Sequence, residues 1–149
     1  MTINKETGDI IFSGGQVLKA RMTLEELMNS RIMEFVVPGQ EDELNSSVIF
    51  LELRIPDVHG HSIDMDLGIY NKKVGKITII LEDYYNFYRE NPYNMDEYEK
   101  VVMVQRDFLE RVLQESGVPY KCDYDWGWIE QDMDYRNAEK LMINIFYFN

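Results

Sequence analysis

The residue types that bind metals gather in one short stretch of the chain. His59 and His61 are the only histidines, Asp57 comes before them, and Asp64 follows. Two imidazoles two residues apart, together with a carboxylate, can hold a zinc ion that activates water. The spacing matches none of the usual zinc signatures, and Arg54 is expected to pair with Asp64. We therefore favour a polar hairpin loop without a metal, and a metal-dependent enzyme using His59, His61 and Asp64 is the alternative.

A second group that could do chemistry is the pair Asp64 and Asp66, with Glu82 further along. The two aspartates share one face of a predicted strand. Paired carboxylates serve acid–base catalysis or glycoside hydrolysis when an apolar pocket raises the pKa of one of them. Arg54 and Lys76 are expected on the same face, so we interpret the group as a solvated charge ladder. No catalytic residue and no cofactor is predicted.

Acidic and aromatic residues coincide in two segments, 82–99 and 123–139. Each holds six acidic residues and one arginine, so together they supply −10 of the formal net charge of −12. Aromatic side chains among like charges are typical of binding hot spots that face a basic protein. The alternative is that the tyrosines pack on the sheet edge with their hydroxyls in water. The predicted partner-binding residues are Asp83, Tyr84, Tyr85, Tyr88, Tyr93, Trp128, Asp132, Asp134 and Tyr135.

The length and composition limit the class of protein. The chain has 149 residues, which is most economically one domain spanning 1–149. A net charge of −12 repels nucleic acid and anionic membranes and attracts basic proteins, although acidic excess also serves solubility. The single cysteine, Cys122, fits a reducing compartment. No apolar run approaches the ~18 residues of a membrane span, so we expect a cytoplasmic protein.

The candidate residues are positioned by a three-stranded antiparallel meander predicted over residues 48–82. Its odd positions are apolar and its even positions are mostly polar, which indicates a sheet with one solvated face. Pairing the apolar positions across the first turn sets Arg54 opposite Asp64, and across the second turn it sets Ile69 opposite Ile77. The apolar positions are Ile49, Leu51, Leu53, Ile55, Ile63, Met65, Leu67, Ile69, Ile77, Ile79 and Leu81.

One long helix is predicted at about 95–116. Asn94 and Glu97 have capping-box spacing at its start, and Gly117 is suited to end it. Its apolar residues recur three and four apart, so one stripe should pack on the meander. The stripe consists of Tyr98, Val101, Val102, Gln105, Phe108, Leu109, Val112 and Leu113.

Shorter elements complete the predicted fold. Thr23 and Glu26 form a capping box that begins a short helix near 24–30. The strands predicted outside the meander are a hairpin within residues 1–20, a strand at 32–37 and two final strands at 126–132 and 141–148. The last strand is so apolar that it should be central. We therefore predict an α+β fold, with an antiparallel sheet of about six or seven strands and the long helix on one face.

Three stretches resemble a known group of proteins: TINKETGDIIFSGG, MTLEELMNS and the ending WGWIEQDMDYRNAEKLMINIFYF. They cover roughly a third of the chain and are similar to small bacterial proteins found as immunity proteins of polymorphic toxin systems. The resemblance implies an acidic, cytoplasmic, non-enzymatic protein that occludes a toxin domain, often a basic nuclease. It assigns a role to no individual residue.

We therefore expect a stoichiometric, non-enzymatic protein that binds a basic partner protein, and neither nucleic acid nor membrane. The motivation is the clustered negative charge among aromatic residues. Two alternatives stay open besides solubility: the metal-dependent enzyme described above, and a structural subunit that assembles through exposed strand edges.

Overall fold

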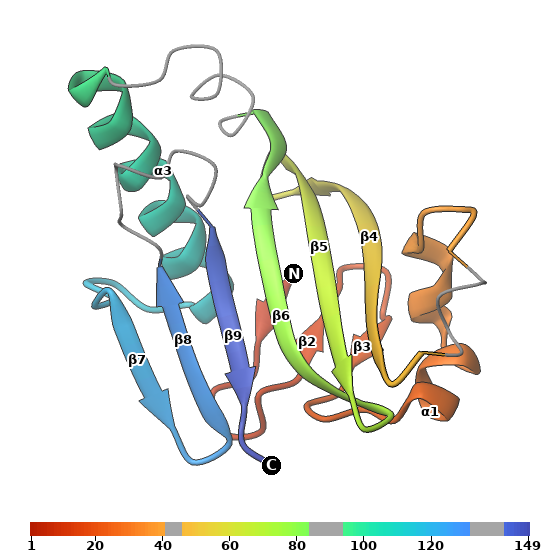
Figure 1. Cartoon of the computed structure of the whole chain (residues 1–149). Helices are drawn as coiled ribbons and strands as arrows, with labels where there is room; N and C mark the ends of the chain where they lie inside the picture. The colour runs from red at the N-terminus through yellow and green to blue at the C-terminus, as the bar shows by residue number, and fades with distance from the viewer. Residues whose placement is uncertain (41–45, 84–93, 132–141) are drawn as a thin grey trace.

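The computed structural model describes residues 1–40, 46–83, 94–131 and 142–149, and its fold is α+β, as predicted. The described strands form two antiparallel sheets, with the orders β1-β2-β3 and β4-β5-β6-β9-β8-β7 (Figure 1). The strands are β1 (Thr2–Ile3), β2 (Ile10–Ile11), β3 (Val17–Leu18), β4 (Val48–Val58), β5 (His61–Tyr70), β6 (Lys73–Leu81), β7 (Lys121–Tyr124), β8 (Gly127–Gln131) and β9 (Ile143–Tyr147).

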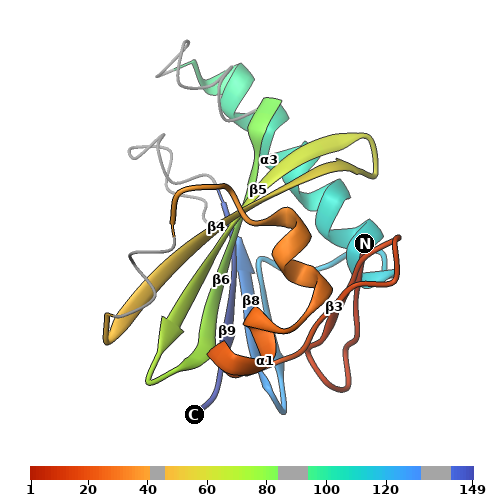
Figure 2. The ribbon, with the colours of Figure 1, turned by 90° about the vertical axis from the view of Figure 1, so that its right-hand side faces the viewer.

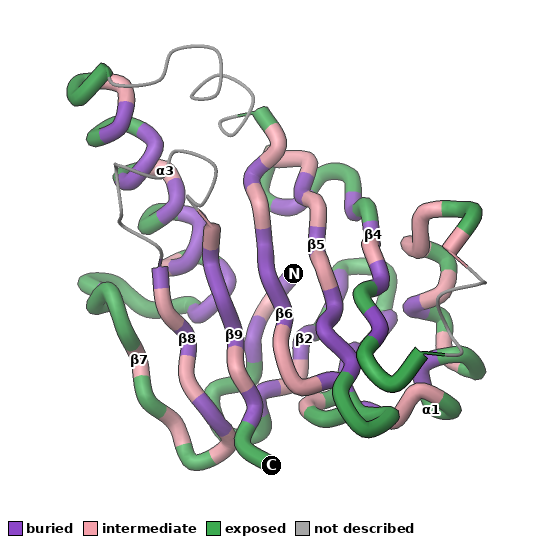
Figure 3. Tube along the Cα trace, in the orientation of Figure 1, coloured by how far each residue is buried: buried purple, intermediate pink, exposed green. Residues whose placement is uncertain are grey.

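Among the described residues, helices and the smaller sheet cover one face of the six-stranded sheet. The helix α3 (Met95–Leu113) and the three-stranded sheet lie against this covered face, whereas α1 (Leu24–Met28) and the 3₁₀ helix η1 (Arg31–Phe35) flank the β4 edge (Figures 1 and 2). No described helix or second sheet lies on the opposite face in Figure 2. We call this opposite face, which bears Glu52, Asp66 and Trp128, the open face. Buried residues alternate with less buried ones along the strands (Figure 3).

The meander forms as predicted, but its second hairpin has a different register. Arg54 lies opposite Asp64, which confirms the first hairpin. In the second hairpin Ile77 lies opposite Leu67 instead of Ile69. The turn consists only of Asn71 and Lys72, both with positive φ. Beside the turn, the register shifts at a bulge between Gly68 and Ile69. Because the register differs by two residues, the apolar side chains remain on the covered face.

The long helix buries the predicted stripe completely and ends earlier than predicted. All eight stripe residues are buried. The Asn94 side chain accepts a hydrogen bond from the Glu97 amide at 3.3 Å, so the predicted N-cap is confirmed. The helix ends at Gln114, which takes the left-handed conformation with φ of 53°. Gly117 lies beyond the cap, where its amide donates to Glu110 at 2.8 Å.

Two of the short elements differ from the prediction. The capping box of Thr23 and Glu26 begins α1 as expected. Residues 31–35, however, form η1 rather than the start of a strand, because the Ser30 hydroxyl accepts from the Ile32 amide and begins a turn. Only the single bridge between Val36 and Leu53 remains of the predicted strand.

The short strands β3 and β7 were not predicted. The expected hairpin of residues 1–20 is a three-stranded sheet, and β7 extends the larger sheet beyond β8. Strands of two and four residues are too short to display a period. The last strand, β9, is central as predicted, between β6 and β8. No helix in the described part of the chain has the length and apolar character needed to cross a membrane.

Candidate functional site

The two acidic segments meet the six-stranded sheet at the same end. Ile79, Ile143 and Gln131 lie in one register row across β6, β9 and β8. β6 and β8 are parallel, since each is antiparallel to β9, so their carboxyl ends are separated by two strand spacings, about 10 Å. Segment 82–99 therefore starts close to the point where segment 123–139 leaves β8.

Two of the nine predicted partner-binding residues are described. Asp83 is exposed just beyond the end of β6. Trp128 is half-buried on the open face of β8, opposite Phe146. The other seven lie outside the described residues: Tyr84, Tyr85, Tyr88, Tyr93, Asp132, Asp134 and Tyr135. The sequence predicts that the strand following the long helix brings the two segments into one patch, and this stays a prediction.

A cluster of carboxylates spans β4 and β5 on the open face. Glu52 lies opposite Asp66, and Arg54 lies opposite Asp64. The Arg54 guanidinium donates to Asp64 at 3.1 Å and to Glu52 at 3.4 Å, so the predicted ion pair is confirmed. Glu82 adds a further negative charge near Arg54, although Asp64 lies opposite Ile80 and not opposite Glu82 as the predicted register required.

Asp66 is the member of this cluster with the most perturbed environment. Burial raises the pKa of its carboxyl above the ordinary value, and the charges of Glu52 and Asp64 raise it further. Lys76 opposes this effect only as the smallest contribution. The open face therefore holds an excess of negative charge that Arg54 does not balance, and a cation from a partner would relieve it.

An aromatic cluster lies on the same face, across β8 and β9. Trp128 stacks on Phe146 with ring centroids 4.7 Å apart, and Phe148 packs at 5.7 Å from Trp128. The ammonium groups of Lys76 and Lys121 lie over Phe146 and Trp128 at 5.1 and 5.3 Å, which is cation–π distance. Our sequence reasoning included only Trp128 in a site. Phe146 and Phe148 are two residues apart in the last predicted strand, so the alternation of side chains between the faces could have placed both in one cluster.

The structure does not bring the three candidate metal ligands together. His59 and His61 pack their rings against Phe108 of α3, with centroids 6.2 and 5.9 Å away, and His59 Nε2 lies 2.9 Å from the Met1 carbonyl oxygen. Asp64 extends from the open face, where it binds Arg54. Among the described residues, no group of three or more His, Cys, Asp or Glu side chains is placed to hold a metal ion.

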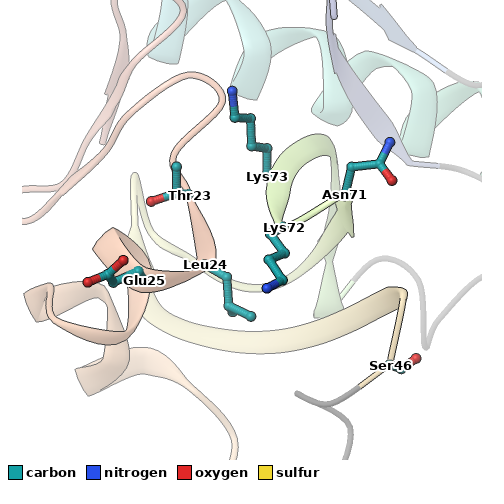
Figure 4. A pocket seen from close by; sticks show the side chains of 7 residues that line it. All are labelled: Thr23, Leu24, Glu25, Ser46, Asn71, Lys72 and Lys73. Atoms are coloured by element: carbon teal, nitrogen blue, oxygen red, sulfur yellow. The ribbon is translucent and has the colours of Figure 1, made fainter.

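A hollow of about 570 Å³ lies between the start of α1 and the β5–β6 turn (Figure 4). The residues that line it are Thr23, Leu24, Glu25, Ser46, Asn71, Lys72 and Lys73. Lys72 and Lys73 point in different directions in Figure 4. The Thr23 hydroxyl donates to the Glu26 carboxylate at 2.8 Å as part of the capping box of α1. The hollow therefore supports no specific reaction.

Cys122 lies in β7 beside another hollow, of about 300 Å³. Burial raises the pKa of its thiol, and burial likewise raises the pKa of Tyr124 to about 12. A thiol with a raised pKa is a poor nucleophile at neutral pH, so this cysteine is suited to packing.

No protein-family model matches the chain, and no curated protein or solved structure matches it either. A function for this chain is therefore inferred from its surface.

Proposed function

We propose that this chain is a stoichiometric, non-enzymatic binding protein that covers a basic partner protein with an acidic surface rich in aromatic residues. The observation that carries the proposal is the cross-strand group of Glu52, Asp64 and Asp66, whose negative charge Arg54 only partly balances. In the same sheet β6 and β8 end at the same side, and there segment 82–99 begins and segment 123–139 leaves β8.

The partner chemistry follows from the charge. Like-charged carboxylates on a surface attract a basic protein over long distances and accelerate its association. Exposed aromatic side chains next to these charges supply the short-range contacts that hold a partner. The resemblance to immunity proteins implies that the partner is a toxin domain, and occlusion of such a domain requires no catalytic residue in this chain.

Co-purification from the native host at low and high salt tests the proposal. We expect a basic protein to be retained at low salt and released as salt screens the attraction. The variant Asp64→Asn with Asp66→Asn should retain less of it. A matched control is Glu6→Gln with Asp107→Asn, which removes the same charge from exposed positions outside this group and outside both acidic segments. Recovery of no partner, or of a partner that is acidic on its contact face, contradicts the proposal.

A further inference from the structure

The open face is organised in two parallel rows that run across all six strands. The register between neighbouring strands defines them, and they lie two residues apart along each strand, about 7 Å. The aromatic row consists of Phe50, Gly68, Lys76, Phe146, Trp128 and Asp123. The carboxylate row consists of Glu52, Asp66, Thr78, Asn144, Glu130 and Lys121.

Two glycines, Gly68 and Gly75, leave room for a further aromatic side chain, Tyr70, at the β4 side of the aromatic row. A Cβ on Gly68 would lie 2.8 Å from the Tyr70 hydroxyl oxygen, and a Cβ on Gly75 would lie 2.9 Å from the Tyr70 ring. Because both positions lack a side chain, the Tyr70 ring lies across the sheet and meets Phe50 edge-on, with centroids 6.3 Å apart. Phe50 is 57% exposed and Phe148 is 48% exposed. Large apolar groups concentrated on one surface are typical of an interaction site.

The carboxylate row is negative on the side of β4 and β5, where Glu52 and Asp66 lie, and neutral in the centre, whereas on the far side Glu130 lies opposite Lys121. In the centre, the Thr78 hydroxyl donates to the Asn144 side chain at 3.0 Å. Asp66 makes no ion pair with any described residue. On the other side, the Trp128 indole donates to the Glu130 carboxylate at 3.3 Å, which links the two rows. A ligand that contacts the aromatic row therefore also meets carboxylates.

We infer that the open face binds an amphipathic basic segment of a partner protein. Its apolar side chains lie on the aromatic row, and its lysines or arginines reach Glu52, Asp66 and Glu130. This inference rests on the proposed function and adds the position of the site and the chemistry of the segment. Aromatic rings beside lysines also suit single-stranded nucleic acid, but carboxylates about 7 Å away repel its phosphates, so a basic peptide is favoured.

The size of the rows sets the size of a suitable probe. Five spacings between six strands give about 24 Å, which is the length of a helix of about 16 residues. The probe is therefore an amphipathic peptide of about this length made only of leucine and lysine. One control peptide replaces each lysine with glutamate, and a second replaces each leucine with serine. A single-stranded oligothymidine of similar length is the fourth ligand.

The two tryptophans provide a readout with an internal control. Trp126 lies on the covered face, where its indole donates to the Lys5 carbonyl, whereas the Trp128 indole lies on the open face. In a titration of ¹⁵N-labelled protein with the leucine–lysine peptide, we expect the Trp128 indole resonance to shift and that of Trp126 to stay. Each control peptide should bind at least about tenfold more weakly, since each loses one of the two contributions.

Paired substitutions then locate the charge. Glu52→Gln with Asp66→Asn should weaken binding of the peptide about tenfold, whereas Glu6→Gln with Asp107→Asn, at exposed positions outside the open face and both acidic segments, should weaken it less than about twofold. If Trp126 responds instead of Trp128, or both pairs weaken binding equally, the inference fails while the proposed function stands. If the basic peptide does not bind even at low salt, both fail. A shift of Trp128 with oligothymidine overturns the inference in favour of a nucleic-acid platform.

Discussion

The two faces of the six-stranded sheet are built from alternate residues of the same strands, and they differ in how their side chains are satisfied. On the covered face, Leu53, Met65 and Ile77 are completely buried beneath other elements. On the open face, their neighbours Arg54, Asp66 and Lys76 are polar and retain contact with water. Side chains that stabilise the core and side chains in contact with water therefore alternate along each strand. Substitutions should reproduce this alternation, with large losses of stability on one face and small ones on the other.

The largest loss is expected for Phe108→Ala. Phe108 is 1% exposed and packs against His59 and His61 on the covered face. Its removal leaves a cavity and should lower the free energy of unfolding by about 4 kcal/mol in urea denaturation. Met103 on the same helix is 65% exposed, so Met103→Ala should cost less than about 0.5 kcal/mol. Equal losses for the two variants would show that α3 does not seal this face.

Gly127→Ala tests the link between β8 and β9 beneath the aromatic row. A Cβ at Gly127 would collide with the carbonyl oxygen of Phe146, which is backbone and has little freedom to move. We expect a loss of about 3 kcal/mol, measured by thermal or urea unfolding. Gly60 is the comparison, because its Cβ would meet no atom within 4 Å although its φ is +83°. Gly60→Ala should cost about 1 kcal/mol, and a larger loss there than at Gly127 would contradict the packing.

Thr78 and Asn144 are an exception on the open face, because both are buried and satisfy each other. Thr78→Val leaves the buried Asn144 side chain without its donor and should cost about 2 kcal/mol. The double variant with Asn144→Leu removes both polar groups, so it should recover most of this loss. Chemical denaturation of these two variants and of Asn144→Leu alone gives the coupling energy. Purely additive effects would mean that the hydrogen bond contributes nothing.

The smallest effect concerns Asp66 and depends on pH. Its pKa is raised in the folded state by burial and by Glu52 and Asp64, so the ionised carboxylate destabilises the fold above that pKa. Asp66→Asn should therefore stabilise the protein at neutral pH, by less than about 1 kcal/mol because solvent screens the site. Below the ordinary value of 3.8 the carboxyl is protonated in both states, and the gain should vanish. A gain that persists there in unfolding curves would exclude charge as its origin.

The sequence by itself predicted those features that depend on neighbours in the chain. The alternation in residues 48–82 correctly placed the eleven apolar side chains at odd positions on the covered face, whereas Val58 and Val74, at even positions, are also buried because the strands shift register near them. The three-four spacing identified every buried residue of the stripe on α3, and the capping box located the start of α1. These signals are local, because a strand repeats every two residues and a helix every 3.6.

Only the tertiary structure decided which distant residues become neighbours. The aromatic cluster joins Lys76 with Phe146 and Trp128, and the two rows exist because β9 inserts between β6 and β8. The apolar pattern alone allows registers that differ by two residues. The bulge at Gly68 and the short turn at Asn71 select one of them. Strand order depends on which arrangement buries the most apolar surface for the whole chain, and no short window of sequence contains that information.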